Sequence, residues 1–221
     1  MFNVLFWANI GQGCWETLYM VATSTALSYL FGLPLGILLV ISAKGHIWEH
    51  LWLNRILAVI VNATRSIPFI IALIILTPLT RIIVGTFIGT TASIVPLTIV
   101  AIPFVARMIE TSMQEIDSNL IEAALSMGAN TQQIILKLLI PESTISMIRG
   151  LAITMINLIG YSAMAGVIGG GGLGTLAYYY GYQRYETATL WVTVILLIIL
   201  VQGIQKLIGD MTVNWVINKR R

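Results

Sequence analysis

Long runs of apolar residues, separated by short polar segments, dominate the pattern of this chain. Five runs come close to the length of about 20 residues that a helix needs to cross the hydrocarbon core of a bilayer. The runs are continuously apolar, whereas the strands of a membrane barrel alternate between apolar and polar residues. Because an unpaired strand leaves its backbone unsatisfied in lipid, the pattern predicts five transmembrane helices. These helices are expected over residues 17–42, 56–79, 93–109, 145–168 and 189–208.

The second run is interrupted by the sequence Arg65-Ser66-Ile67-Pro68. An arginine in the middle of a transmembrane helix is costly, because its charge must leave water. The favoured interpretation places residues 51–63 in an amphipathic helix at the membrane surface and starts the crossing helix near Arg65. Pro68 then lies in the first turn of that helix, where its missing N–H is tolerated. The alternative is a buried arginine with a functional role.

The composition supports a membrane protein with one domain over residues 1–221. Hydrophobic residues make up 57% of the 221 residues, charged residues only 10%, and the mean hydropathy is +0.90. Soluble domains carry about 25% charged residues, so most of this surface must face a medium other than water. We therefore expect an all-α, polytopic membrane protein.

Candidate metal ligands are few. The single cysteine, Cys14, excludes an internal disulfide and a cysteine metal cluster. His46 and His50 have the i, i+4 spacing of a metal-binding pair, but no further ligand lies nearby in the sequence. Because both flank Trp48, we interpret this segment as a loop at the membrane interface and expect no metal site.

Lysine and arginine residues predict the orientation, since cytoplasmic loops are enriched in both. With the N-terminus outside, ten of the 12 basic residues fall on the inner side and two, Arg81 and Arg184, on the outer side. The inner residues are Lys44, Arg55, Arg65, Arg107, Lys137, Arg149, Lys206, Lys219, Arg220 and Arg221. The C-terminus and the polar segment between the third and fourth runs are then cytoplasmic. The net charge of +3 follows from this topology and gives no reason to expect a nucleic-acid partner.

The polar segment over residues 118–141 carries the signals of two short helices joined by a turn. Asn119 can cap the first helix, with Glu122 three residues later in the capping-box position. Ala123 and Ala124 follow, and such small residues favour a helix and permit close approach by another surface.

The turn and the second helix have signals of their own. Gly128 can adopt the left-handed conformation that ends a helix. Thr131 can cap the next helix, and Pro141 can end it. A merely solvated loop would not need this order of cap, turn and stop. The segment is therefore predicted to be a compact helix-turn-helix that fits a groove of a soluble partner.

The spacing within this segment resembles the coupling motif of ABC importer permeases. In this chain the motif consists of Glu-Ala-Ala, three residues, Gly128, nine residues and Leu138-Leu139-Ile140-Pro141. The family form ends in Ile-x-Leu-Pro, and the departures here keep the apolar character. The resemblance implies that the segment docks into a cleft of a cytoplasmic ATPase. The residues that match the motif are Glu122, Ala123, Ala124, Gly128 and Pro141.

A wider likeness is to the permease of methionine ABC importers. It covers most of the chain, in the segments RSIPFII (65–71), IVGTFIG (83–89), IVPLT (94–98), PFVARM (103–108), GYSAMAG (160–166), GGGGLG (169–174) and YYYGYQRY (178–185). The resemblance implies the type I importer permease fold and the import of methionine, as the L- and also the D-isomer, across the bacterial inner membrane. It further implies a homodimer with the path at its two-fold interface.

The same resemblance implies the remaining partners. Two copies of the ATPase would hold ATP and Mg²⁺, and an extracytoplasmic methionine-binding lipoprotein would deliver the substrate. This chain itself contains no Walker A sequence and no catalytic constellation, so we expect neither a cofactor in it nor enzymatic activity. The run Gly169 to Gly174 follows a membrane helix rather than a strand, and we interpret it as a flexible or tightly packed outer turn.

The fourth run carries the candidate residues of the translocation path. Polar side chains in a membrane helix often face the interior of a bundle or a cavity, and a flexible methionine can plug a narrow passage. We therefore predict a path or gate at Asn157, Tyr161, Ser162 and Met164. The small residues Gly160, Ala163 and Gly166 are interpreted as helix-packing positions.

Two other functions stay open at this point. The chain could be an ABC permease for another amino acid or small solute, because the coupling motif alone does not specify the substrate. A secondary transporter or channel that needs no ATPase is less favoured. Such proteins are often built from inverted repeats, and we find no internal repeat, while five spans do not divide into equal halves.

Overall fold

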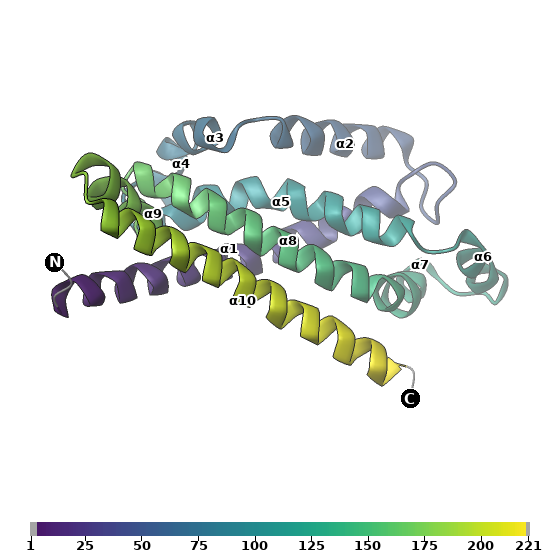
Figure 1. The fold of residues 1–221 in the computed structure, drawn as a ribbon. Coiled ribbons are helices and arrows are strands. Elements are labelled where there is room, and N and C mark those ends of the chain that lie inside the picture. The colour runs from purple at the N-terminus through teal and green to yellow at the C-terminus, as the bar shows by residue number, and fades with distance from the viewer. Residues whose placement is uncertain (1–3, 220–221) are drawn as a thin grey trace.

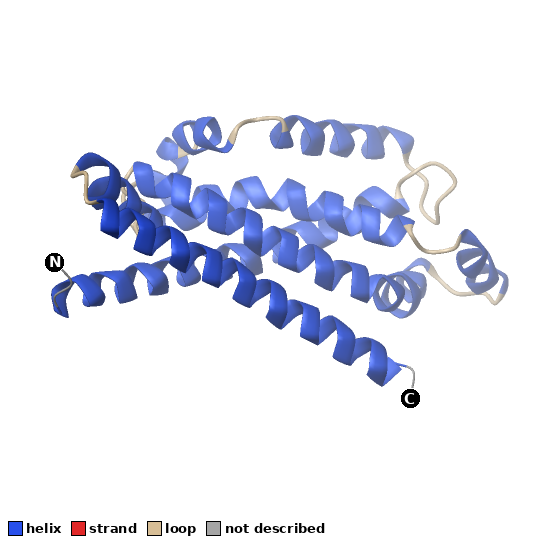
Figure 2. Cartoon of the chain, viewed as in Figure 1, coloured by secondary structure: helices blue, strands red, loops and turns tan. Residues whose placement is uncertain are grey.

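The computed structural model describes residues 4–219, and the side chains of residues 4–212. All regular elements in this part of the chain are helices joined by short loops, as Figure 2 shows. In order they are α1 (Val4–Ile41), α2 (Leu51–Arg65), α3 (Phe69–Ile75), α4 (Thr77–Val84), α5 (Thr90–Gln114), α6 (Ser118–Ser126), α7 (Thr131–Ile134), the π-helix η1 (Ile135–Leu139), α8 (Ile140–Val167), α9 (Gly172–Leu176), the π-helix η2 (Ala177–Gln183) and α10 (Thr187–Lys219).

Four long helices, α1, α5, α8 and α10, give the molecule its elongated shape (Figure 1). The start of α1 lies at the same end as α9 and the start of α10, and α6 and α7 lie at the opposite end. α10 contacts η2 and α8, and Ile204 and Ile208 in its second half are buried in one core cluster with Leu158 of α8. The segment predicted to meet a soluble partner is therefore remote from the N-terminus.

Two glycines of α1 allow close packing against α5. A Cβ atom added at Gly32 would lie 2.8 Å from the Cβ of Val105. One added at Gly36 would lie 2.6 Å from the Cβ of Ile109. The two glycines are one turn apart on one face of α1, the arrangement by which small residues let membrane helices approach.

Four of the five predicted spans are confirmed as long apolar helices. Among the described residues, the helical segments long and apolar enough to cross a membrane are 4–41, 90–114, 131–167 and 187–212. The predicted spans 17–42, 93–109, 145–168 and 189–208 coincide with parts of these segments. The helices are longer than the predicted spans. The backbone hydrogen bonds of each helix continue through the polar residues that flank its apolar run.

The prediction of a continuous helix over residues 56–79 is wrong. The chain breaks at Ser66 to Pro68, and α2 and α3 are bent relative to each other by 103°. Pro68 has an extended backbone and precedes the first turn of α3, since proline disfavours continuation of the preceding helix. Arg65 lies at the end of α2 and is exposed in this chain.

The favoured interpretation predicted a helix over residues 51–63, and α2 confirms that helix. α2 contacts α1 and α5 through Val61, which packs with Leu39 and Ala106. Figure 1 shows α2 running beside α5 along the length of the bundle. By length and composition, the bent pair of α2 and α3 can form a fifth span, and its position in the membrane stays a prediction.

Candidate coupling site and translocation helix

The first helix of the polar segment, α6, begins at a different cap from the one predicted. Asp117 has an extended backbone, and its Oδ1 accepts a hydrogen bond from the backbone N–H of Asn119 at 2.9 Å. Asn119 already lies inside α6 and cannot be the cap. Glu122 and Ala123 are exposed on α6, while Ala124 is partly buried against the bundle.

The turn after α6 forms as predicted, whereas the second helix begins at a different cap from the one predicted. Gly128 has a φ of +80°, and its N–H donates to the carbonyl of Leu125 at 2.9 Å. The cap of α7 is Asn130 rather than Thr131. The Oδ1 of Asn130 accepts from the N–H of Gln133 at 2.9 Å, and the Oε1 of Gln133 accepts from the N–H of Asn130 at 2.9 Å. This reciprocal pair is a capping box, placed one residue earlier than predicted.

Pro141 does not end the second helix, contrary to the prediction. The helix continues from Thr131 to Val167 through the π-helical segment η1. Proline has no N–H, and its ring clashes with the carbonyl four residues earlier in a regular α-helix. The wider π turn accommodates it: the N–H of Ile140 donates to the carbonyl of Ile135, five residues back. The polar segment is thus continuous with α8.

The α6–α7 segment is seated on the bundle by an apolar face. Ile134 and Leu139 are buried with Ile109 and Met113 of α5, and Ile121 of α6 packs against them. An open groove of about 460 Å³ lies between the end of α6 and the α7–η1 segment. The groove is lined by Ala124, Met127, Gly128, Ala129, Gln133, Ile134, Lys137 and Leu138. The groove exposes apolar surface to the outside, since Met127 is 82% exposed.

α8 presents one open face, and two of the predicted path residues lie on it. Ile153, Gly160, Met164 and Val167 are exposed at helical spacing, and Asn157 lies between them on the same face. A Cβ atom added at Gly160 would meet nothing within 4 Å in this chain. We call these five residues the α8 stripe. Gly160, interpreted as a helix-packing position, therefore packs on no other helix of this chain.

The other two predicted path residues have different surroundings. Tyr161 is partly buried and stacks on Phe69 of α3, with 4.6 Å between ring centroids and 8° between ring planes. Ser162 is 2% exposed, and its hydroxyl donates to the carbonyl of Ile159 at 2.8 Å. The structure thus brings together Asn157 and Met164, places Tyr161 beside them and turns Ser162 into the bundle.

The glycine run after α8 is a tightly packed turn. Gly169, Gly171 and Gly172 have φ values of +86°, +82° and +74°, which L side chains rarely adopt. The carbonyl of Gly169 accepts a hydrogen bond from the N–H of Gly89 before α5, at 2.9 Å. The interpretation as a tightly packed turn is confirmed, and no part of the run lies between a strand and a helix in the described chain.

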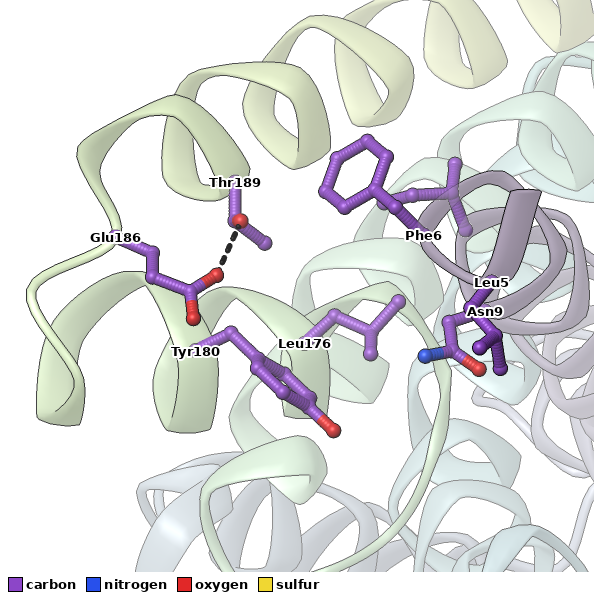
Figure 3. A pocket seen from close by; sticks show the side chains of 8 residues that line it. Leu5, Phe6, Asn9, Leu176, Tyr180, Glu186 and Thr189 are labelled. Carbon is purple, nitrogen blue, oxygen red and sulfur yellow. Dashed lines mark hydrogen bonds between the residues drawn. The ribbon is translucent and has the colours of Figure 1, made fainter. Parts of the chain in front are cut away.

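A cavity of about 200 Å³ lies between the first turns of α1, the α9–η2 segment and the start of α10 (Figure 3). Leu5, Phe6 and Asn9 enter it from one side, and Tyr180 and Glu186 from the other. The cavity leaves the first turns of α1 loosely packed. This contact could not be predicted from the sequence, because it joins residues far apart in the chain.

The loop after α1 holds the two histidines. Burial lowers the pKa of His46 from its ordinary value, because the imidazolium loses hydration. His50 packs edge-on against Trp48, with 4.5 Å between ring centroids. Within the described residues no group of three or more His, Cys, Asp or Glu side chains is placed to hold a metal ion.

Comparison with known proteins identifies the family. A family profile described as "binding-protein-dependent transport system inner membrane component" matches residues 32–210. The chain belongs to this family. The family predicted from the coupling motif is therefore confirmed, and the chain is a multi-pass membrane protein.

Individual relatives of this permease agree with the family. It is 52% identical over 200 residues to the probable D-methionine transport system permease protein MetI of Vibrio cholerae, covering 90% of this chain and 88% of the relative. It is 45% identical over 212 residues to the methionine import system permease protein MetP of Bacillus subtilis, covering 96% and 95%.

Solved structures confirm the fold of this permease. A chain of the MetNI methionine ABC transporter in inward-facing conformations superposes with a TM-score of 0.94 at 44% identity, covering 96% of this chain and 98% of that one. A chain of an amino acid ABC transporter with histidines has the same fold, with a TM-score of 0.79 at 18% identity. The type I importer permease fold predicted from the sequence is therefore confirmed.

Proposed function

We propose that this permease is the membrane-spanning subunit of an ATP-driven ABC importer that carries methionine across the bacterial inner membrane. The observation that carries the proposal is the exposed α6–α7 segment, which is continuous with the membrane helix α8. Relatives at 45% and 52% identity have names that specify methionine transport, which supports the substrate.

The energy source lies on another polypeptide. The chain has no Walker A sequence, so ATP and Mg²⁺ bind to an ATPase partner, and this subunit is a conduit rather than an enzyme. The matched family acts in transport systems with further components. The exposed Glu122 and Ala123 of α6, together with the groove beside Gly128, form the surface that meets the ATPase.

A rigid connection transmits the motion of the partner. Pro141 is absorbed by η1, so α7, η1 and α8 move as one helix over residues 131–167. ATP binds one arrangement of the two ATPase copies with higher affinity than the other. Only such a difference in affinity can shift the permease between its inward-open and outward-open states. Displacement of the α6–α7 segment then moves the α8 stripe directly.

The α8 stripe is where two copies of the permease meet and enclose the path. The partly buried Asn157 lies midway along a membrane helix, where a side-chain amide without a partner is costly in lipid. A second copy or water in the path satisfies it. Gly160 lets the two helices approach, and Met164, 47% exposed, lies where it can close the passage.

The opposite end of the molecule receives the substrate. The orientation with the N-terminus outside and the α6–α7 segment in the cytoplasm follows from the distribution of lysine and arginine. An extracytoplasmic methionine-binding lipoprotein then docks at the end that holds the start of α1, α9 and η2. Two permease copies, two ATPase copies and this lipoprotein make up the working importer.

Uptake by the reconstituted transporter tests this function. Proteoliposomes that contain the permease and its ATPase, with the binding protein outside, should accumulate radiolabelled L-methionine only when ATP is present in the ATPase compartment. Competition with unlabelled D-methionine and with other amino acids measures the breadth of the substrate. Uptake that proceeds without ATP would contradict the assignment, and ATP-driven uptake of another amino acid alone would contradict the substrate.

A further inference from the structure

Two side chains of α1, Glu16 and Thr17, hold the start of α9. Glu16 Oε2 accepts a hydrogen bond from the backbone N–H of Gly172 at 2.7 Å. Thr17 Oγ1 accepts one from the N–H of Leu173 at 2.9 Å. The first N–H groups of a helix have no partner inside that helix. The two side chains therefore cap α9 from a helix more than 150 residues away in the sequence.

Further contacts fix Glu16 and the surface around it. Its Oε1 accepts a hydrogen bond from the Nε2 of Gln12 at 2.8 Å, so both carboxylate oxygens are engaged. Gly13 lies one turn from Thr17, and a Cβ atom there would lie 2.7 Å from the Cδ1 of Leu176. Hydrogen bonds to a carboxylate are roughly twice as strong as neutral ones. α1 thus determines where α9 lies.

α9 in turn packs on α8 on both sides of Met164. A Cβ atom added at Gly174 would lie 2.5 Å from the Cα of Ala163, and one added at Gly166 would lie 2.4 Å from the backbone nitrogen of Thr175. The hydroxyl of Thr175 also donates to the carbonyl of Gly166 at 3.1 Å. Ala163 and Gly166 flank Met164 in the sequence, so α9 cannot shift without moving the backbone that carries Met164.

From this series of contacts we propose that Glu16 is a positioning residue for the gate. Together with Thr17 it holds α9, and α9 holds Met164 across the path. The proposal rests on the proposed function, because Met164 is a gate only where α8 lines the path. Loss of the hydrogen bonds frees α9, lets Met164 leave the closed position and uncouples ATP hydrolysis from import.

Two measurements on the complete transporter test this role. The rate of amide hydrogen exchange reports how firmly residues 169–176 are held in place. The number of methionine molecules imported per ATP hydrolysed reports how well the gate couples ATP hydrolysis to import. In Glu16→Ala and in Thr17→Val, exchange over residues 169–176 should accelerate at least tenfold. Import per ATP should fall at least fivefold. Thr17→Ser, which keeps the hydroxyl, should restore both values.

The control is Glu186→Ala, which removes another acid at the same end of the molecule, bonded to Thr189 rather than to α9. It should leave exchange over residues 169–176 and the import ratio unchanged. If Glu16→Ala does not yield a folded protein, Thr17→Val carries the test, because it removes the side-chain oxygen that accepts the N–H of Leu173. Unchanged exchange would overturn the cap on α9, and faster exchange with an unchanged import ratio would overturn the role in gating. Failure of the wild-type transporter to import methionine would instead count against the proposed function, since the exchange measurement needs no transport.

Discussion

At the scale of single residues, glycine decides how closely the helices of this permease approach. Gly36 lies against Ile109, where an added Cβ would be 2.6 Å from the Cβ of that side chain and 2.7 Å from the carbonyl oxygen of Ala106. Gly11 lies on the same helix, and a Cβ there would meet nothing within 4 Å. The same substitution should therefore have opposite effects at the two positions.

The expected result of Gly36→Ala is a loss of stability of about 1–3 kcal/mol, the usual range for overpacking a close contact. Gly11→Ala should be neutral or stabilising by about 0.5–1 kcal/mol, because alanine favours a helix and finds open space. The midpoint of thermal unfolding of the permease in detergent measures both. Equal shifts for the two variants would show that the α1–α5 contact does not depend on Gly36.

Local signals explain which residues of the polar segment could be predicted. Gly128 was placed correctly, because its left-handed turn depends only on its immediate neighbours. The caps were each misplaced, at Asn119 instead of Asp117 and at Thr131 instead of Asn130. Asp, Asn and Thr are all good caps, so a run that holds several of them does not show which one has the extended backbone.

At the scale of elements, Pro68 breaks the helix and Pro141 does not, and the surroundings of each proline explain the difference. Pro68 ends an exposed stretch over residues 62–68, and the chain bends there by 103°. Pro141 lies in a helix that is anchored on both sides by buried residues, among them Leu139, and a π turn absorbs the mismatch. A sequence pattern contains the proline but not the packing that decides between a break and a π turn.

The role of α8 as the meeting point of two copies can be tested by cross-linking. Cys14 is the only cysteine, so Cys14→Ser gives a background free of thiols. In that background Met164→Cys should convert most of the permease to a covalent dimer with a short bismaleimide, because the α8 stripes face each other across the path. The test is the fraction of dimer on a denaturing gel.

The matched control is Ile195→Cys on α10, whose side chain is 52% exposed. It should stay monomeric, since in this arrangement that side of α10 faces lipid. Efficient cross-linking at position 195 with none at 164 would place the dimer interface on α10 and remove the argument for a path along α8.

At the scale of the whole molecule, the proposed function places the entry of energy and the entry of substrate at opposite ends of the fold. The α6–α7 segment lies at one end and α9 with η2 at the other, and α8 runs between them (Figure 1). The long helices could be predicted, because apolar runs are a property of the chain alone, and the orientation derived from the charge distribution stays a prediction. The cap that Glu16 provides for α9 could not be predicted, since it joins residues 16 and 172 only after folding.

The central claim is that the α6–α7 segment couples a separate ATPase to methionine import. The most direct measurement compares Glu122→Lys with Asp210→Lys, which reverses an exposed acid outside that segment. In Glu122→Lys, co-purification of the ATPase or methionine import per ATP hydrolysed should fall at least tenfold, because the reversed charge faces the docking cleft. In Asp210→Lys both should match the wild type. Wild-type assembly and wild-type coupled import in Glu122→Lys would contradict the claim.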